Sequence, residues 1–434
     1  MGRIAYRVVV GRTGYHSQSE AFRSTHLNKK RSDIVWNICS ECGTEQPESY
    51  LYACPSCEGI LLPQYENGHL SISDSTQKGI WRYHASLPPV PAKSRLYLGE
   101  GMTPLIPSVR LGRKLGIGEL YFKYEGGNPT GSYKDRIAAM GLSWALGQGR
   151  GACIGTSSGN AGAAIAAYAA RAGMPYHLFV LENVAEAKLA QSLLYKANVR
   201  KIKGFGNDPE IGMRVFDRIF EGAADHGWEV MITAFRYNPY AMEGVKTIAY
   251  EIYEELKGMP SHVYSPAGGG GLYCGIWKGF NEIYESVRTA AAPCMVAVQP
   301  EGCSNIVRAY QAGSKEPLPG SSTSQISGLQ VPNPPDGKLA LQIMNRGGGK
   351  GIAVSDSLIW ETQRLLAVEE GIFCEPAGAA SVAGLIRDCE ENPGRSLDKV
   401  VCVISGNGFK DGKRLSDMTS EIHVPCLDVE HLDI

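Results

Sequence analysis

The chain has 434 residues, of which 43% are hydrophobic and 20% are charged, and its formal net charge is −1. A chain of this length exceeds one ordinary hydrophobic core, so we expect at least two domains, and the hydrophobic share excludes a disordered protein. The near-zero charge argues against broad electrostatic binding to nucleic acid, and no apolar run is long enough for a membrane-spanning helix.

The amino-terminal segment is basic. Residues 1–32 contain a single acid, Glu20, against the basic residues Arg3, Arg7, Arg12, Arg23, Lys29, Lys30 and Arg31. This composition is typical of an organelle transit peptide and also of a solvated basic arm, and it lacks the apolar region of a secretory signal. We therefore treat 1–35 as a basic extension of a cytoplasmic protein, with import into an organelle as the alternative.

The next region, 36–66, contains four of the chain's 12 cysteines in the spacing Cys39-x2-Cys42-x11-Cys54-x2-Cys57. Thiolates paired in this way form the two knuckles of a tetrahedral zinc site, which predicts a structural zinc ribbon. A disulfide pair or a redox site is the alternative. The other cysteines lie mostly in apolar runs and are most simply reduced core residues, which indicates a reducing compartment.

A lysine follows on a turn of small residues, in the stretch Asn128-Pro-Thr-Gly-Ser-Tyr-Lys134-Asp-Arg136. A lysine amine is protonated at neutral pH and becomes a nucleophile only where its surroundings disfavour the charge. The turn would open a helix, which is where a Schiff-base lysine would sit. Taken alone, Lys134 is better explained as a solvated lysine in a loop.

Three further segments each join a strand-like run to a turn that contains glycine: Thr156–Gly162, Ser265–Gly271 and Ser405–Asp411. Gly268, Gly269, Gly270 and Gly271 would let backbone N–H groups close around an oxyanion at the start of a helix over 272–280. The run has neither the Walker pattern nor the Rossmann spacing, so a nucleoside triphosphate or a dinucleotide is not indicated.

Between these segments the sequence alternates between strand-like and helical stretches. Strands are predicted at 176–181, 199–203, 230–233 and 295–298, and helices at 163–172, 209–224 and 240–256. Such alternation predicts a mostly parallel sheet covered by helices. The segment 316–338 has no clear periodicity, which indicates a surface loop.

Together the four turn segments resemble the fold type II pyridoxal-phosphate enzymes, and most closely their threonine synthase branch, over residues 95 to 415. Gly99–Leu105 and Glu375–Ala380 also match signatures of that family. The resemblance implies an α/β fold in which two open, mostly parallel sheets face each other across the cofactor. It implies a large domain from 67–136 and 236–434, and a small mobile domain at 137–235.

The resemblance also implies roles for individual residues. Lys134 would hold the cofactor as a Schiff base and then move protons on the substrate. Asn160 would bind the ring's phenolic oxygen, the four glycines would bind the phosphate, and Ser405 would meet the ring nitrogen. A hydroxyl stabilises a protonated ring less than a carboxylate does, which favours elimination and replacement over transamination. Ser157, Ser158 and Gly159 would offer N–H groups to the substrate carboxylate.

Four positions depart from the threonine synthase pattern. Where that branch places polar side chains around the phosphate of O-phosphohomoserine, this chain has Ala161, the pair Phe235-Arg236 and Ala241. Arg236 could supply a substitute cation for the substrate. Each lost charge-assisted bond is worth about 1.5–3 kcal/mol, so the substrate is in doubt while the cofactor residues are complete.

The sequence therefore predicts a threonine synthase-like lyase or synthase that catalyses elimination or replacement at Cβ or Cγ of a small amino acid. The cofactors expected are pyridoxal 5′-phosphate and a structural Zn²⁺, and the family resemblance implies a homodimer. A diverged β-replacement synthase that uses O-phosphoserine or O-acetylserine, a threonine or serine dehydratase, and a non-catalytic binding module are the alternatives.

Overall fold

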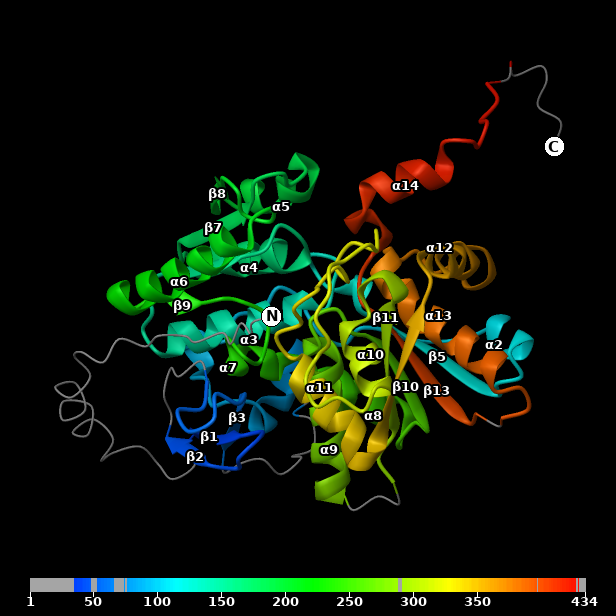
Figure 1. The fold of residues 1–434 in the computed structure, drawn as a ribbon, viewed down its shortest axis with the longest axis horizontal. Coiled ribbons are helices and arrows are strands. Elements are labelled where there is room, and N and C mark those ends of the chain that lie inside the picture. The colour runs from blue at the N-terminus through cyan, green and yellow to red at the C-terminus, as the bar shows by residue number, and fades with distance from the viewer. Residues whose placement is uncertain are drawn as a thin grey trace, which may run out of the picture.

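The computed structural model describes residues 35–47, 53–65, 74, 76–287, 291–395, 397–426 and 428. The predicted basic extension at 1–35 therefore lies almost entirely outside the described residues. Within the described ranges, none of the helices combines the length and the apolar character that crossing a bilayer would require. The strands form three separate sheets, which Figure 1 shows in three regions of the molecule.

The first sheet is antiparallel and small, in the order β2-β1-β3, with β1 at Val35–Cys39, β2 at Glu45–Pro47 and β3 at Leu61–Tyr65. Buried and partly exposed residues alternate along β1 and β3, as expected of strands with one face toward the protein body. The sheet carries the cysteine region, and in Figure 1 it lies below α3 and α7.

The largest sheet has six strands in the order β12-β11-β10-β13-β5-β4. Five of them are parallel, and β4 pairs with β5 in the antiparallel sense. The strands come from two distant parts of the chain: β4 (Leu105–Pro107), β5 (Glu119–Tyr124), β10 (His262–Pro266), β11 (Cys294–Pro300), β12 (Gly349–Val354) and β13 (Lys399–Ile404).

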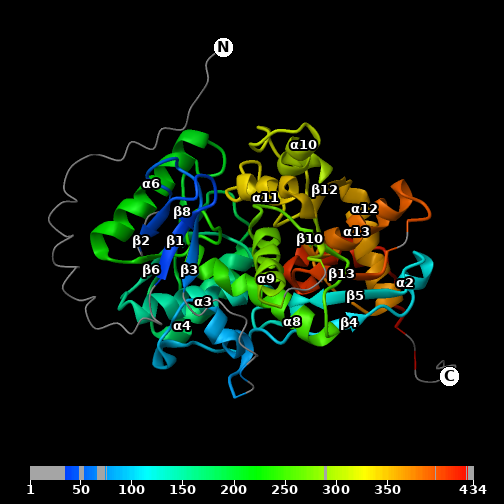
Figure 2. The same ribbon diagram turned by 90° about the horizontal axis from the view of Figure 1, so that it is seen from below.

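Side chains alternate across this sheet and fill two different cores. Met295 and Ala297 of β11 pack with α9 in one core, whereas Val296 and Val298 pack with α13 in the other. Because successive residues of a strand face opposite sides, the sheet is covered on both faces, which explains why β10, β11 and β13 are buried along almost their whole length. Figure 2 shows α9 and α13 on opposite sides of the strands.

The second parallel sheet has four strands in the order β8-β7-β6-β9: β6 (Cys153–Thr156), β7 (Tyr176–Leu181), β8 (Asn198–Ile202) and β9 (Glu229–Val230). All four strands fall within the segment 137–235. Ile154 and Val230 pack with α6 on one face, whereas Cys153 and Leu178 belong to the core shared with α3 and α4. The predicted arrangement of two open, mostly parallel sheets is therefore confirmed.

The helices are α2 (Leu111–Lys114), α3 (Lys134–Gly147), α4 (Asn160–Ala172), α5 (Ala190–Leu194), α6 (Pro209–His226), α7 (Pro239–Met242), α8 (Thr247–Leu256), α9 (Gly271–Val287), α10 (Asn305–Gln311), α11 (Gly337–Ile343), α12 (Asp356–Leu365), α13 (Pro376–Glu391) and α14 (Gly412–Thr419). The predicted helix over 240–256 is instead α7, a 3₁₀ turn at Glu243–Lys246, and α8. The predicted strand over 230–233 is shorter and ends at Val230.

Local sequence explains the limits of the best predicted helix, α6. Asp208 caps its start by accepting hydrogen bonds from the N–H groups of Glu210 and Ile211, and Pro209 occupies the first turn, where a missing N–H costs nothing. The helix ends at Gly227, whose φ of 65° is a left-handed conformation that glycine adopts without strain.

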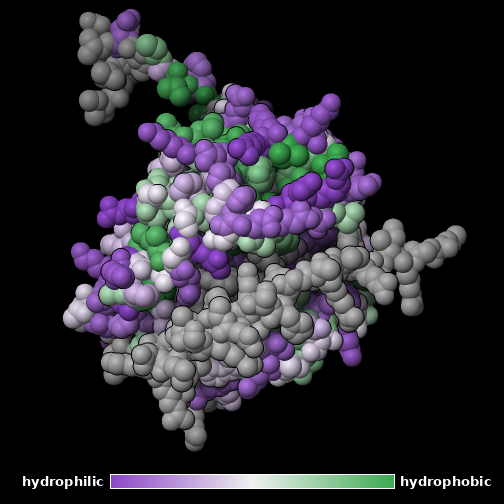
Figure 3. All heavy atoms as spheres, turned by 90° about the vertical axis from the view of Figure 1, so that its left-hand side faces the viewer, coloured by the Kyte–Doolittle hydropathy of each residue, from purple (hydrophilic) through white to green (hydrophobic). Residues whose placement is uncertain are grey.

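Two features of the molecular surface are visible in the figures. Figure 1 shows α14 projecting from the body toward the carboxyl end, and all of its residues are at least partly exposed. In Figure 3, the coloured part of the face on the side of the four-stranded sheet is mainly hydrophilic, with scattered apolar groups. Exposed apolar residues of the segment 137–235 include Leu193, Leu194 and Met213.

Candidate active site

The lysine turn connects β5 to α3, and Lys134 is the first residue of α3. Gly131 has a φ of 89° and donates its N–H to the carbonyl of Asn128 at 2.8 Å, which makes the turn tight. The Lys134 Nζ donates a hydrogen bond of 2.7 Å to the hydroxyl of Thr233 and lies 4.7 Å from the centre of the Tyr133 ring. The lysine is therefore held in place and partly buried.

A buried ionic network of Arg136, Glu125 and Glu251 packs against this turn. Arg136, two residues after the lysine, is fully buried and forms paired hydrogen bonds with Glu125 (2.7 and 2.8 Å) and Glu251 (2.6 and 2.7 Å). Burial by itself raises the pKa of Glu251, but the charges of Arg136 and Lys123 outweigh it and lower that pKa to about 2. Removing one partner of such a buried network typically costs about 3–5 kcal/mol.

The Asn160 segment follows β6 and starts α4. Asn160 is the first residue of that helix, and Ser157, Ser158 and Gly159 form the turn before it. Their backbone N–H groups lie at the start of a 13-residue helix, where an anion is favoured. A Cβ at Gly162 would lie 2.2 Å from the carbonyl oxygen of Ser157, so only glycine permits this close turn.

Ser405 follows β13 and lies against the lysine turn. The N–H of Tyr133 donates to the carbonyl of Ser405 at 3.0 Å, and Ser132 pairs with Gly406 in an isolated β-bridge. Residues that are more than 270 positions apart in the sequence are thereby brought side by side. The structure thus places Ser405 against Tyr133, the residue that precedes Lys134.

Glu375 joins the segment of Asn160 to that of Ser405. The sequence assigned it no role. Its carboxylate accepts hydrogen bonds from Asn160 Nδ2 at 3.2 and 2.9 Å and from Ser405 Oγ at 3.0 Å. Glu375 is 7% exposed, and burial raises its pKa, although the hydrogen bonds from Asn160 and Ser405 lower it. Its position as the first residue of a family signature, just before α13 (Pro376–Glu391), was the available signal.

The glycine run lies between β10 and α9 and is packed closely by other backbone. A Cβ at Gly268 would lie 2.7 Å from the carbonyl oxygen of Gly328, and one at Gly270, where φ is 93°, would lie 2.9 Å from that of Asp336. Side chains are therefore excluded from both positions. The run offers only backbone N–H groups at the start of the 17-residue helix α9.

Asp336, in the segment predicted as a surface loop, is fully buried beside this run. It donates its backbone N–H to the carbonyl of Gly269 at 3.0 Å, and its carboxylate accepts from the N–H groups of Phe235 and Arg236, each at 3.0 Å. Because the segment shows no hydrophobic period, no local pattern predicts a buried acid here.

Arg236 is the predicted site residue that the structure does not bring to the others. Its backbone N–H bonds to Asp336, but its guanidinium donates a hydrogen bond of 2.9 Å to the carbonyl of Glu58. Glu58 directly follows Cys57 in the cysteine region. The side chain that could have served as a substitute cation for the substrate therefore contacts the small amino-terminal sheet.

The four predicted metal ligands do come together. The sulfur atoms of Cys39, Cys42, Cys54 and Cys57 all lie within 4.8 Å of one another, with Cys39 to Cys57 at 3.4 Å and Cys42 to Cys54 at 3.7 Å. A disulfide bond would require about 2.05 Å, so these cysteines are free thiols in this structure. The spacing fits four thiolates around one tetrahedral ion.

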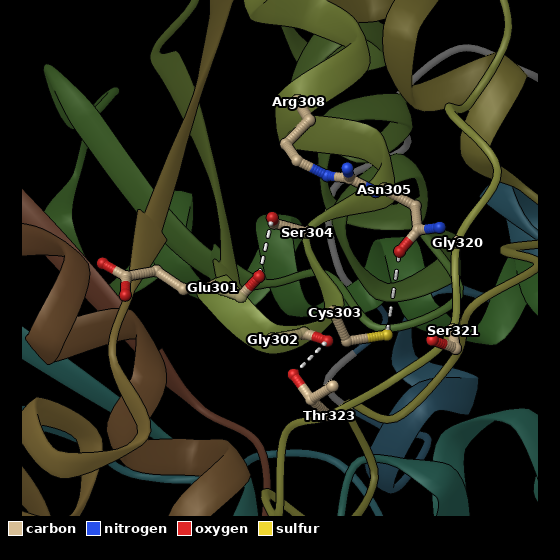
Figure 4. A pocket seen from close by; sticks show the side chains of 9 residues that line it. All are labelled: Glu301, Gly302, Cys303, Ser304, Asn305, Arg308, Gly320, Ser321 and Thr323. Atoms are coloured by element: carbon tan, nitrogen blue, oxygen red, sulfur yellow. Dashed lines mark hydrogen bonds between the residues drawn. The ribbon is translucent and has the colours of Figure 1, made fainter.

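A separate hollow of about 310 Å³ lies at the end of β11 and contains none of the predicted site residues. Figure 4 shows Thr323 donating to the carbonyl of Gly302, and Ser304 donating to that of Glu301, with Arg308 at one side. The hollow therefore belongs to the turn that follows β11 and does not overlap the site around Lys134.

Comparisons with known proteins agree with this geometry. The family model described as pyridoxal-phosphate dependent enzyme matches residues 96–406. The chain is 36% identical over 383 residues to a threonine synthase of Methanocaldococcus jannaschii, covering 86% of this chain and 92% of that protein. It is 34% identical over 391 residues to a threonine synthase of Methanosarcina acetivorans, covering 88% of this chain and 94% of the relative.

Solved structures share the fold at low sequence identity. Diaminopropionate ammonia lyase from Escherichia coli superposes with a TM-score of 0.62 at 21% identity, covering 75% of this chain and 89% of that one. Maize serine racemase gives a TM-score of 0.61 at 22% identity, covering 74% and 92%. From the family match and the extent of the sequence identity, the chain belongs to the pyridoxal-phosphate dependent enzymes of fold type II and is a threonine synthase-like member of that family.

Proposed function

We propose that this enzyme holds pyridoxal phosphate on Lys134 and catalyses elimination or replacement at Cβ or Cγ of a small amino acid. The observation that carries the proposal is that hydrogen bonds link the three separate segments that contain Lys134, Asn160 and Ser405. The backbone bond between Tyr133 and Ser405 joins two of the segments, and the carboxylate of Glu375 joins the third.

The residues present fit this cofactor. The closely packed glycines 268–271 would hold the phosphate through backbone N–H groups, because a side chain there would collide with neighbouring backbone. Asn160 would bind the phenolic oxygen of the ring and Ser405 the ring nitrogen. When bound, pyridoxal phosphate withdraws electrons from the substrate's Cα and makes the proton on that carbon removable.

The protein's own groups would bind the substrate and transfer the proton. The N–H groups of Ser157, Ser158 and Gly159 would bind the substrate carboxylate at the start of α4. The amine of Lys134, held by the hydroxyl of Thr233, would take the proton from Cα and return a proton later in the reaction. The leaving group would depart, and water or another nucleophile would add, or the product would hydrolyse to a keto acid.

The nearest named activity is threonine synthase, which converts O-phosphohomoserine to threonine and phosphate. It is supported by the names of the relatives and by the share of each chain that is matched. A β-replacement synthase or a hydroxy-amino-acid dehydratase is the second candidate. It is favoured by Ala161, Phe235 and Ala241, which are buried apolar residues where phosphate donors are expected.

The test begins with the holoenzyme and O-phospho-L-homoserine, with phosphate and amino acid products followed together. Phosphate with threonine would establish threonine synthase. Keto acid formed from threonine or serine would establish the dehydratase. Lys134→Ala should lose at least about 1,000-fold in turnover with any substrate, and full turnover by that variant would contradict the assignment.

A non-catalytic binding module is the remaining alternative. Sodium borohydride should fix the cofactor irreversibly to Lys134 in the wild-type protein, and the labelled peptide can be identified by mass. A protein that never carries the cofactor would support the binding module instead.

Several further features belong to the same proposal. We propose a structural Zn²⁺ on Cys39, Cys42, Cys54 and Cys57, since a closed four-thiolate site has no open position for catalysis. Residues 137–235 would form a mobile domain that closes on the substrate, and 36–66 the zinc ribbon. The enzyme would act as a cytoplasmic homodimer on a small amino acid, with no nucleic acid or membrane partner.

A further inference from the structure

Both knuckles of the cysteine cluster contact the part of the protein that packs against the glycine run. We define the first knuckle as residues 39–42 and the second as residues 54–58, so that each contains two of the four cysteines. The glycine run at 268–271 lies in the main body of the enzyme and is assigned to the phosphate of the cofactor. No step of the proposed reaction connects the cluster to that site.

The second knuckle contacts this region through Arg236. The Arg236 guanidinium donates a hydrogen bond of 2.9 Å to the carbonyl of Glu58, and its backbone N–H donates one of 3.0 Å to Asp336 Oδ1. Asp336 in turn donates its N–H to the carbonyl of Gly269 at 3.0 Å. Three hydrogen bonds therefore lead from the residue after Cys57 to the glycine run.

The shape of the second knuckle depends on the cluster. Glu58 has a φ of 60°, a left-handed conformation that residues other than glycine adopt only at a cost. Its N–H donates to the carbonyl of Cys54 at 2.8 Å, and a Cβ at Gly59 would lie 2.6 Å from the sulfur of Cys39. A metal ion on all four sulfurs would hold this strained turn, and its loss would release the carbonyl that Arg236 contacts.

The first knuckle contacts the same region through Lys338. The Lys338 Nζ lies 2.6 Å from Glu41 Oε2 and 2.5 Å from Glu316 Oε1. Glu41 belongs to the first knuckle, and its backbone N–H donates to the sulfur of Cys39 at 3.4 Å. Lys338 is the second residue after Asp336, in α11. The two knuckles are therefore each connected to Asp336, one through hydrogen bonds and one through the chain.

Other contacts attach the small sheet to the body. The hydroxyl of Tyr65 donates a hydrogen bond of 2.8 Å to the carboxylate of Glu243, and both residues are buried. Arg346, beyond the carboxyl end of α11, donates to the carbonyl of Ser40 at 3.5 Å. The two contacts described first are exposed or partly exposed, so they can be removed without detaching the sheet.

From these contacts we infer that the ribbon at 36–66 positions the phosphate-binding glycines, so that zinc on the four cysteines and pyridoxal phosphate on the body strengthen each other's binding. Arg236 and Lys338 are the positioning residues that transmit this effect. The inference rests on the proposed function, because it requires both the metal and the cofactor. Coupling between two sites is reciprocal, so each ligand changes the affinity of the other by the same factor, typically about 5- to 150-fold.

The first experiment measures the dissociation constant of pyridoxal phosphate for the full chain, with zinc bound and after zinc has been removed by dialysis against EDTA and then buffer. A phosphine reductant keeps the cysteines as thiols. We expect zinc removal to raise this constant by at least about 5-fold. The dissociation constant of zinc, measured by competition with a coloured chelator, should fall by the same factor when the cofactor is bound. A smaller change in either constant would overturn the inference.

Pyridoxal, which lacks the phosphate, shows whether the effect reaches the glycine run. It can still react with Lys134, but it has no group for the glycines to hold. We therefore expect zinc removal to weaken the binding of pyridoxal phosphate at least about 3-fold more than that of pyridoxal. A smaller difference would indicate a general loosening of the body and would overturn the role of the glycine run.

The double variant Arg236→Met with Lys338→Met tests the route. It removes both side-chain contacts and keeps their apolar stems, so zinc removal should change its affinity for pyridoxal phosphate by less than about 2-fold. A larger zinc dependence in the folded variant would contradict this route. Arg218→Met with Lys413→Met removes an arginine and a lysine from exposed ion pairs on α6 and α14, and this matched control should keep the full zinc dependence.

Failure of the proposed function can be told apart from failure of this inference, because these measurements use no substrate. A chain that fails to bind zinc or pyridoxal phosphate would contradict the proposed cofactors and the inference together. A chain that binds both, with independent affinities, would overturn the inference alone. If zinc removal unfolds the protein, the zinc-loaded variants decide. The Arg236 and Lys338 variant should then bind pyridoxal phosphate at least about 5-fold more weakly than the control variant, and a smaller difference would overturn the inference.

Discussion

The hydroxyl of Ser405 donates a hydrogen bond of 3.0 Å to the carboxylate of Glu375. A carboxylate accepts but does not donate, so the proton of the serine is committed to Glu375 and its oxygen remains free to accept elsewhere. The same carboxylate accepts from Asn160. Two side chains expected to contact opposite edges of the cofactor ring are therefore oriented by one buried acid.

Replacing Glu375 should disturb both contacts. Glu375→Gln keeps the size of the side chain but replaces one accepting oxygen by an NH2 group, which only donates. We therefore expect kcat to fall by about 10- to 100-fold. The absorbance spectrum of the bound cofactor should also shift, because the groups facing its ring change. Glu361→Gln, on the exposed side of α12, serves as the control, and an unaltered spectrum in Glu375→Gln would argue against this orienting role.

Thr233 should position the lysine amine through its hydroxyl. Thr233→Val removes the acceptor that lies 2.7 Å from Lys134 Nζ, and we expect kcat to fall by about 10-fold with little change in KM. Thr233→Ser keeps the hydroxyl and should restore kcat. A Ser variant as impaired as the Val variant would indicate a packing role.

Gly270 should tolerate no side chain. Gly270→Ala would place a Cβ 2.9 Å from the carbonyl oxygen of Asp336 at a φ of 93°, so we expect the dissociation constant of the cofactor to rise by about 10- to 100-fold. Equilibrium dialysis or fluorescence titration measures it. Gly212→Ala in α6, where a Cβ meets open space, should bind the cofactor normally.

The four-cysteine cluster should bind one zinc ion. Cys54→Ser removes a buried ligand, and we expect the zinc content to fall from about one ion per chain toward zero and the melting temperature to drop by several degrees. Cys426→Ser changes an exposed cysteine outside the cluster and should have no effect on either quantity. A wild-type protein that contains no metal after purification without chelators would refute the site.

Stability should fall as the pH rises toward 8, and Glu229 should account for part of the fall. Burial raises the pKa of Glu229 to about 7. Between its ordinary value near 4.3 and pH 7, the folded protein keeps a proton that the unfolded chain has released, so the free energy of unfolding decreases over this interval.

The variant Glu229→Gln tests this assignment. Glutamine cannot ionise and still accepts the hydrogen bond that Asn238 donates at 3.0 Å. Relative to wild type, the variant should gain up to about 3 kcal/mol in stability between pH 5 and pH 8. Glu100, Asp135 and Asp336, whose pKa values burial also raises to about 7, are present in both proteins and cancel in the difference. Parallel melting curves for the two proteins across this range would contradict the assignment.

Local sequence by itself determined much of the architecture and the list of chemical groups. The continuous apolar runs of β7, β10, β11 and β13 predict buried parallel strands, and glycine-bearing turns after the strands predict where a ligand would bind, because both signals depend only on neighbouring residues. The spacing of the four cysteines likewise determined the cluster, since each pair forms a local knuckle.

Only the tertiary structure decided how these groups meet. Glu375 lies between Asn160 and Ser405 because α13 packs beside β13, and the guanidinium of Arg236 turns to Glu58 because the amino-terminal sheet lies beside α7. Asp336 lies against the glycine run although its segment has no periodicity, because the segment folds back onto that run and the N–H of Asp336 donates to the carbonyl of Gly269. Contacts between residues so distant in sequence leave no local pattern, and the arrangement of the candidate site depends on them.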